Sequence, residues 1–213
     1  MRSHFSAAQL VLDALNLAAT DLPLLEHTGE YQDLVRATTP DDVYTGLRAI
    51  GRILNAQQRA ETLVEALEER INIIVHKLKF IPETHKPRVL LLQAISPLTA
   101  IRQAYLDNLV RIAGGIPLLE TAAAGEQPDI IILISKEPVP QLLKEVPGLF
   151  SAPAWRHVPA IMHSNIFIIH HNQYLRQPGA LIADDAEILA EIIHPKYFIF
   201  GRDEDVWMRF NLS

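Results

Sequence analysis

Hydrophobic positions between residues 41 and 78 recur every three or four residues, with polar positions between them. This period is that of an amphipathic helix. The pattern pauses between Gly51 and Asn55, so it predicts one long helix or two abutting helices. The part at 56–79 alone would span about 36 Å at 1.5 Å per residue, which is enough for a strut between two lobes. The start is marked by an N-cap, a first-turn proline and two acids, at Thr39, Pro40, Asp41 and Asp42.

The segments before this helix have shorter apolar patterns. Residues 8–12 form an apolar run that predicts a strand, and 14–27 carry helix formers up to Thr28 and Gly29. A second short strand is predicted at 31–36. The chain is therefore expected to open within an α/β pattern.

After residue 81 the pattern changes to an alternation of strands and helices. A proline-bounded, charged connector at 82–87 marks a lobe boundary. The alternation beyond it predicts a mostly parallel sheet that is covered by helices on both faces. The predicted strands are 89–93, 116–119, 130–134 and 166–170, and the predicted helices are 98–113, 139–146 and 182–193. The aromatic tail at 196–212 predicts a pair of strands that turn at 201–205.

The composition says more about possible partners than about the fold. The 213 residues suffice for one large domain or two small ones, and 19 Lys and Arg against 25 Asp and Glu give a net charge of −6. The cations are spread along the chain, so no surface for nucleic acid is predicted. The chain has no cysteine, which excludes disulfides and thiolate metal sites but leaves the redox compartment open.

Neither a membrane span nor a signal peptide is predicted. No apolar run approaches the roughly 20 residues that a spanning helix needs. The first residues, 2–13, are too polar for a signal-peptide core. Export would therefore depend on residues outside this chain, and both cytoplasm and periplasm stay open.

Patterns for catalysis and metal binding are weak. His157, His163, His170 and His171 lie close together in the sequence, but the last two would point to opposite faces of a strand. No HExxH or similar pair is present, so we predict no metal ligands. Glycines and serines lack the phosphate-binding and nucleophile motifs, and the acids at 184–187 complement a helix dipole. The chain is predicted to be a binding protein without a cofactor, not an enzyme.

Candidate binding residues follow from the sheet prediction. In a parallel sheet, the residues just after the strand ends face the ligand crevice. They mix small, aromatic, amide and cationic groups, a composition suited to binding. These residues are Ser96, Pro97, Ser135, Lys136, His171, Asn172, Tyr174 and Arg176.

Two of these residues are expected to dominate binding. Tyr174 and Arg176 lie two apart, so an extended backbone would aim both side chains the same way. The arginine would pair with carboxylates or phosphates, and the tyrosine would stack on a flat macrocycle. In the alternative interpretation, Arg176 pairs with Asp184 or Asp185, and Tyr174 packs under the C-terminal tail.

The order of segments resembles the helical-backbone, class III substrate-binding proteins of ABC importers, which include receptors for cobalamin, ferric siderophores and haem. The resemblance covers about residues 38–195. It rests on the ordered segments TPDDVYTGLRAIGRILNAQQRAETLVEALEERI, KPRVLLLQ, YLDNLVRIAGGIPLL, QPDIIILIS, APAWRHVPAIMHSNIFIIH and YLRQPGALIADDAEILAEIIHP.

The resemblance implies a metal chelate held without covalent chemistry between two lobes that a rigid helix joins. It also implies an ABC permease as partner, with Glu137 or Glu145 in the docking role, and a periplasmic or other extracytoplasmic location. The family begins with a further strand, helix and strand, so the first lobe is expected to be shortened.

The expected fold class is therefore α/β, with a truncated first lobe and a complete second lobe. The expected parts are a remnant of the N-terminal lobe at 1–39, the spanning helix at 40–81, the C-terminal lobe at 82–195 and the tail at 196–213. Besides a chelate receptor, two functions stay open. One is an interaction domain, in which a shortened sheet leaves an open edge for a homodimer. The other is a metal-dependent enzyme that uses the clustered histidines.

Overall fold

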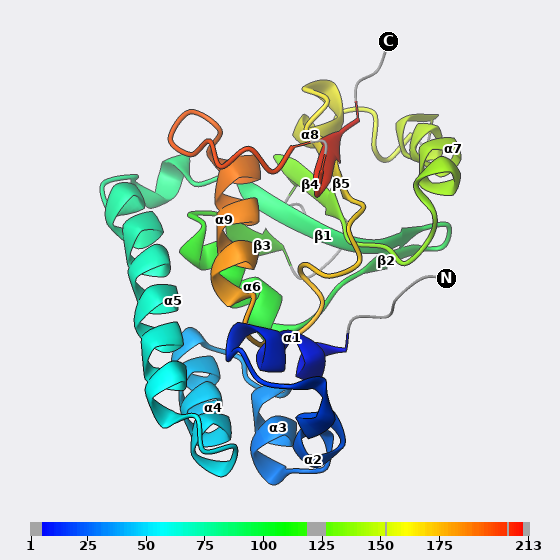
Figure 1. Ribbon diagram of the computed structural model, residues 1–213. Helices are drawn as coiled ribbons and strands as arrows, with labels where there is room; N and C mark the ends of the chain where they lie inside the picture. Colours follow the sequence, from blue (N-terminus) through cyan, green and yellow to red (C-terminus); the bar gives the residue numbers. More distant parts are fainter. Residues whose placement is uncertain (1–5, 119–126, 152, 204, 211–213) are drawn as a thin grey trace.

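The computed structural model describes residues 6–118, 127–151, 153–203 and 205–210, and shows a mixed α/β protein (Figure 1). The helices are α1 (Ala7–Ala14), α2 (Leu22–Glu26), α3 (Gly29–Leu34), α4 (Pro40–Ile53), α5 (Gln57–Leu78), α6 (Ala104–Ile112), α7 (Val139–Ser151), α8 (Pro159–Met162) and α9 (Ile182–Ile193). The strands are β1 (Arg88–Ile95), β2 (Leu98–Ala100), β3 (Ile116–Leu118), β4 (Ile130–Leu133), β5 (Ile166–Ile169) and β6 (Trp207–Arg209).

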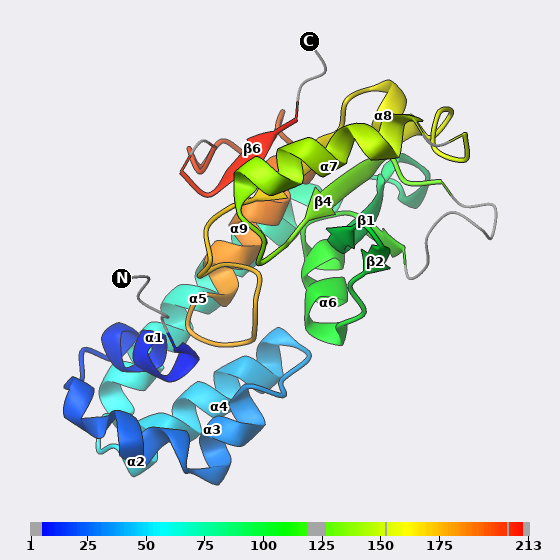
Figure 2. The same cartoon turned by 90° about the vertical axis from the view of Figure 1, so that its right-hand side faces the viewer.

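The sheet has the order β2-β1-β4-β5-β6, with β3 also paired to β1. Strands β1, β3, β4 and β5 pair in parallel, whereas β2 and β6 are antiparallel to their neighbours. The side chains of the central strands alternate between two hydrophobic clusters. One contains residues of α6 and α9, and the other contains residues of α7 and α8 (Figure 2). The predicted parallel sheet with helices on both faces is confirmed.

The first part of the chain is helical, so the two strands predicted at 8–12 and 31–36 are wrong. Ser6 caps α1 by accepting a hydrogen bond from the N–H of Gln9, and Thr28 caps α3 in the same way. A short apolar run does not distinguish a strand from a buried helix turn, and here the capping residues decide. The described residues before Arg88 contain no strand.

The predicted long helical stretch consists of two abutting helices, α4 and α5. The predicted start is confirmed, because Thr39 and Asp42 form a reciprocal capping box. Asn55 has a φ of 52° and ends the first helix, after which α5 continues for 22 residues, about 33 Å at 1.5 Å per residue. Figure 1 shows α5 running alongside both the N-terminal helices and α9.

Gly51 is expected to be indispensable at the contact between α4 and α5. A Cβ atom added there would lie 2.3 Å from the Cβ of Ala60, far inside van der Waals contact. Gly51→Ala should lower the free energy of unfolding by about 1–3 kcal/mol, as overpacking does. Urea denaturation measures this loss. Gly29→Ala is the matched control, because its Cβ would meet nothing within 4 Å, and an equal loss in both variants would contradict the packing argument.

Three elements in the second half differ from prediction. The helix predicted at 98–113 begins only at Ala104, because its first residues form β2 and turn back antiparallel along β1. The described residues of the tail form one strand, β6, which pairs with β5, so the predicted pair of strands is wrong for these residues. Helix α7 extends beyond the predicted 139–146, whereas α9 has the predicted bounds. The predicted positions Leu119, Leu212 and Glu204 lie outside the described residues.

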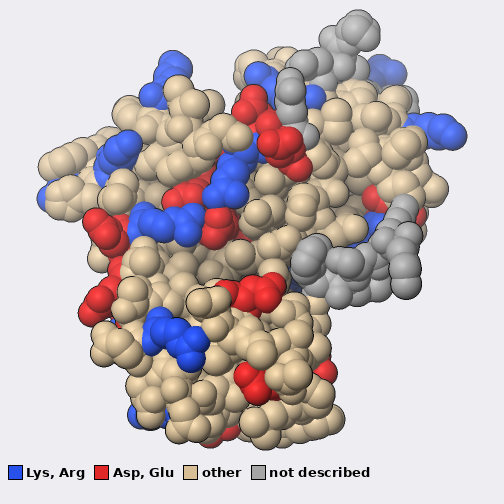
Figure 3. Space-filling model, in the orientation of Figure 1, with Lys and Arg blue, Asp and Glu red and all other residues tan. Residues whose placement is uncertain are grey.

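A charged network joins α5, α9 and the tail. The guanidinium of Arg70 binds Glu187 with two hydrogen bonds of 2.8 and 2.7 Å and also contacts Asp184. Arg202 of the tail binds the same two carboxylates, Asp184 at 2.5 Å and Glu187 at 3.5 Å. Figure 3 shows basic and acidic side chains interleaved on this face. The network fixes the orientation of α5 against α9.

Candidate ligand-binding site

A cavity of about 800 Å³ lies at the carboxyl ends of β1, β4 and β5. Its position follows from the parallel sheet, because the strand ends and the loops after them converge at one edge. Its wall comes from Gln93, Ile101, Gln103, Leu106, Ile134, Lys136, His170, His171, Asn172, Gln173, Leu175, Arg176 and Gln177. The wall therefore combines amides, imidazoles and two cations with aliphatic side chains.

The cavity has a positive charge in a chain of negative net charge. Lys136 and Arg176 line it, and its described lining residues include no Asp or Glu. Among the described residues, no carboxylate lies within ion-pair distance of either cation. A cationic wall of this kind attracts anionic groups, and amides beside it supply further hydrogen bonds.

Arg176 is held in place by the end of β4. Its Nη1 donates to the carbonyl of Ile134 at 3.2 Å, and its Nη2 donates to the carbonyl of Ser135 at 2.7 Å. Burial lowers the pKa of Arg176, and the charge of Asp185 partly offsets this effect. A guanidinium has five N–H donors, so donors remain for a ligand.

Tyr174 does not line this cavity. Leu175 has a φ of 55°, so the backbone between Tyr174 and Arg176 is not extended and the two side chains do not share a face. The ring of Tyr174 lies 5.1 Å from that of His171 and 5.9 Å from the guanidinium of Arg202 in the tail. The contact with the tail matches the alternative predicted for this tyrosine. The alternative for Arg176 was an ion pair with Asp184 or Asp185, and among the described residues it forms neither pair, although the charge of Asp185 acts on it.

Asp185 is buried beneath the loop that carries Arg176. Its Oδ1 accepts the N–H of Leu175 at 2.7 Å, and its Oδ2 accepts the hydroxyl of Tyr105 at 2.9 Å. Burial raises the pKa of Asp185 to about 7, against the two hydrogen bonds, which lower it. Burial raises the pKa of Tyr105 well above its usual value, and the contact with Asp185 raises it further.

The structure brings four of the predicted binding residues together: Lys136, His171, Asn172 and Arg176. Ser135 is buried beside them and contributes its carbonyl to Arg176. Ser96 lines a separate hollow of about 440 Å³ next to α7, and Pro97 is exposed in the same hairpin. Of the predicted docking residues, Glu137 is exposed and Glu145 accepts a hydrogen bond from Gln141.

Several wall residues were missed from the sequence. Gln93 is the last residue of the predicted first strand, whereas β1 continues to Ile95 and holds Gln93 in its interior. The predicted helix includes Gln103, which in the structure precedes α6. His170 is the last residue of the predicted strand, which in the structure ends at Ile169. The correct strand end would therefore have given His170 but not the two glutamines.

The clustered histidines do not form a metal centre in the part of the chain that is described. His170 and His171 line the cavity, and burial lowers the pKa of His171, as does the nearby charge of His170. No three His, Asp or Glu side chains of the described residues are arranged to hold a metal ion. The enzyme hypothesis therefore has no site to support it among these residues.

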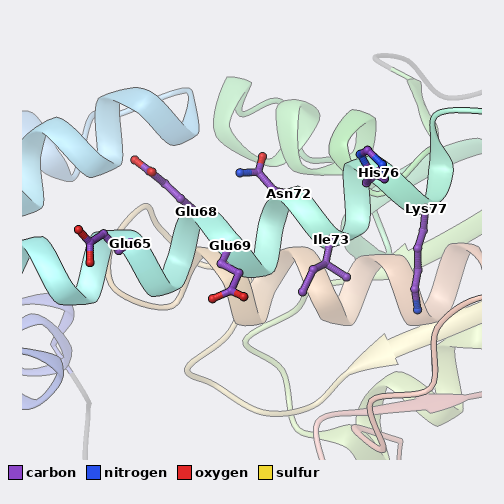
Figure 4. A pocket seen from close by; sticks show the side chains of 7 residues that line it. All are labelled: Glu65, Glu68, Glu69, Asn72, Ile73, His76 and Lys77. Atoms are coloured by element: carbon purple, nitrogen blue, oxygen red, sulfur yellow. The ribbon is translucent and has the colours of Figure 1, made fainter.

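A second hollow, of about 620 Å³, runs along the outer face of α5 (Figure 4). Its residues are Glu65, Glu68, Glu69, Asn72, Ile73, His76 and Lys77. All come from one helix, and Figure 4 shows their side chains spread along it without convergence. This surface is a solvated helix face, as the charge pattern of α5 predicts.

Comparison with solved structures places this fold in a known class. An ABC transporter substrate-binding protein from Listeria monocytogenes EGD-e matches with a TM-score of 0.62 and 17% identity, over 74% of this chain and 66% of that chain. A periplasmic heme-binding protein from Pseudomonas aeruginosa matches with a TM-score of 0.63 and 18% identity, over 84% of this chain and 67% of that chain. The TroA-like periplasmic binding protein FepB from Veillonella parvula matches with a TM-score of 0.61 and 17% identity, over 99% of this chain and 76% of that chain.

The fold is thus that of the periplasmic substrate-binding proteins, as the ordered sequence segments predicted. The chain spans about two thirds of the length of the Listeria protein. No protein-family model and no curated protein matches the sequence. The described helices include none that is both long and apolar enough to cross a bilayer.

Proposed function

We propose that this protein is the substrate-binding component of an ABC-type importer and holds an anionic metal chelate in the cavity beside Arg176. The observation that carries this proposal is the wall itself, in which the described lining residues include the cations Lys136 and Arg176 but no Asp or Glu. The fold supports it, because the solved neighbours are binding proteins, and one of them, IsdE of S. aureus, is complexed with heme. Binding requires no covalent step.

The wall favours some of the predicted ligands over others. Haem carries two propionates, and many ferric siderophores carry carboxylates, so both offer partners to the two cations. Cobalamin offers mainly amides, so it has fewer anionic partners for Lys136 and Arg176. We therefore rank ferric siderophores and haem above cobalamin.

Replacing Arg176 with Ala is expected to weaken an anionic ligand by about 2 kcal/mol, or roughly thirtyfold in Kd, because a desolvated charge pair is lost. Lys136→Ala should weaken it less, since an exposed ammonium is better screened. Titration calorimetry with ferric citrate, hemin and cyanocobalamin measures these values. Lys196→Ala is the control, an exposed lysine outside the cavity.

Two outcomes would contradict the proposal. The first is that none of the three probes binds at high micromolar concentration. The second is that Arg176→Ala binds as the wild type does while losing thermal stability, which would make the residue structural.

Partner and location follow from the same proposal. The partner is an ABC permease, which Glu137 and Glu145 would contact, and the location is periplasmic or otherwise extracytoplasmic. Charge reversal of both glutamates should leave ligand affinity unchanged and abolish stimulation of the permease ATPase. Stimulation that survives the reversal would assign docking to other residues.

The described residues do not support the open sheet edge that the interaction-domain alternative invoked. That alternative rested on a shortened sheet in the first lobe, with an open edge. The described residues of this part are helical and offer no such edge. Light scattering tests the alternative directly, since it requires an obligate dimer.

A further inference from the structure

Asp185 lies behind the cavity wall and connects two parts of it. Its side chain is 1% exposed. It accepts the N–H of Leu175, whose side chain lines the cavity, and the hydroxyl of Tyr105, which precedes the wall residue Leu106. The carboxyl group therefore holds the loop at 171–177 against the start of α6.

We propose that Asp185 is a positioning residue for ligand binding, which fixes the wall at Leu175 and Arg176 and weakens the affinity for an anion when its carboxyl group ionises. The inference rests on the proposed function, since it concerns regulation of the same cavity. In this proposal the proton on Asp185 is a second ligand of the protein, beside the anion.

The sign follows from the charges that act on Asp185. These are Arg176 from the loop and Asp184 from its own helix, with the titratable Tyr105 facing it from α6. When Asp185 is ionised, it offsets part of the charge of Arg176 and repels a bound anion. When it is protonated, Arg176 acts on the cavity unopposed. By linkage, an anion at Arg176 raises the pKa of Asp185, so binding takes up a proton.

Ionisation of Asp185 changes the charge behind the cavity wall more than it changes the shape of the wall. A protonated carboxyl group still accepts the N–H of Leu175 at one oxygen, and its own O–H can donate to the hydroxyl of Tyr105. Asparagine offers the same acceptor and donor without the charge. Asp185→Asn therefore reproduces the protonated state at every pH. The pKa of about 7 places the transition near neutral pH.

Histidines in the same wall require a separate control. Imidazole side chains gain positive charge as the pH falls, which would also favour an anion, and the wall contains His170 and His171. Their contribution remains in Asp185→Asn, whereas that of Asp185 remains when both histidines are replaced with Gln. The two sets of variants therefore separate the two causes.

The first experiment uses the ligand-free protein. NMR follows the amide of Leu175 and the Nε of Arg176 between pH 5 and 9. In the wild type and in the double Gln variant, both signals should titrate near neutral pH, and in Asp185→Asn combined with the two Gln substitutions neither should. A signal of Arg176 that titrates unchanged in Asp185→Asn would overturn the inference.

The second experiment measures the Kd of ferric citrate at pH 6 and pH 8.5. At a given pH the speciation of ferric citrate is the same for all variants. The ratio of the wild-type Kd to the variant Kd therefore reports only on the protein. The wild type should lose at least about fivefold more affinity than Asp185→Asn over this range. Asp107→Asn, a half-buried aspartate of α6 outside the cavity, should follow the wild type.

The two failures are distinguishable. If neither ferric citrate nor hemin binds at any pH, the proposed function is wrong, and the titration of the ligand-free protein still decides whether Asp185 controls the wall. If ferric citrate binds with the same pH profile in wild type and Asp185→Asn, the inference is wrong and the function stands.

Discussion

Glu191→Ala is expected to release the C-terminal tail from α9 and to lower the free energy of unfolding by roughly 3 kcal/mol. Glu191 is buried, and its carboxylate accepts three consecutive backbone N–H groups, those of Phe200, Gly201 and Arg202, at 2.6, 2.8 and 3.2 Å. Its Oε2 also accepts the indole N–H of Trp207 at 3.2 Å. Removal of the carboxylate leaves these donors without an acceptor.

The geometry makes Gln a poor substitute at this position. Successive backbone N–H groups form a concave nest for an anion, and Gly201, at a φ of 71°, allows the backbone to adopt it. An amide would present its own N–H groups to some of the donors. Glu191→Gln should therefore also destabilise the protein.

Urea denaturation and hydrogen exchange of the amides at 200–202 measure both effects. Glu65→Ala, on the exposed face of α5, is the control and should stay within about 0.5 kcal/mol of the wild type. If Glu191→Ala also stays within that range and the tail amides keep their protection, the nest does not stabilise the tail.

The sequence predicts an element correctly where the length and the period of its apolar pattern indicate the same structure. Helix α9 and the central strands have strong apolar patterns of the right length for a single interpretation. The region before residue 38 lacks such a pattern, since the five-residue run at 8–12, with four apolar residues, fits a strand and a helix turn equally well. The sequence nevertheless holds the deciding signal, because Ser6 and Gln9 have the spacing of a capping box.

The sequence predicts residues of the candidate site only where it also predicts how the strands end. Lys136 and Arg176 follow from the rule for parallel sheets, whereas Ser96 fails it because β1 turns into an antiparallel hairpin instead of a crossover. Tyr174 fails for a local reason, the positive φ of Leu175, which no residue type at that position indicates. Contacts such as Glu191 to the tail depend on tertiary structure and have no sequence pattern.

Asp185→Asn is expected to stabilise the protein at pH 8 by up to roughly 4 kcal/mol, and hardly at all at pH 4. The shift of the Asp185 pKa from 3.8 to about 7 amounts to about 3 pH units, and each unit corresponds to about 1.4 kcal/mol. Below pH 3.8 the group is protonated in both the folded and the unfolded chain, so it carries no ionisation penalty. Between 3.8 and about 7 only the unfolded chain loses the proton, and wild-type stability falls as the pH rises.

Above that range both states are ionised, and the difference between wild type and variant should stay constant. Urea denaturation of both proteins at each pH from 4 to 8 gives this difference and cancels the other titrating groups. Asp33→Asn, at an exposed position of α3, serves as the control. A difference that does not grow with pH would show that Asp185 ionises in the folded protein as easily as in the unfolded chain, because its hydrogen bonds to Leu175 and Tyr105 then compensate for its burial.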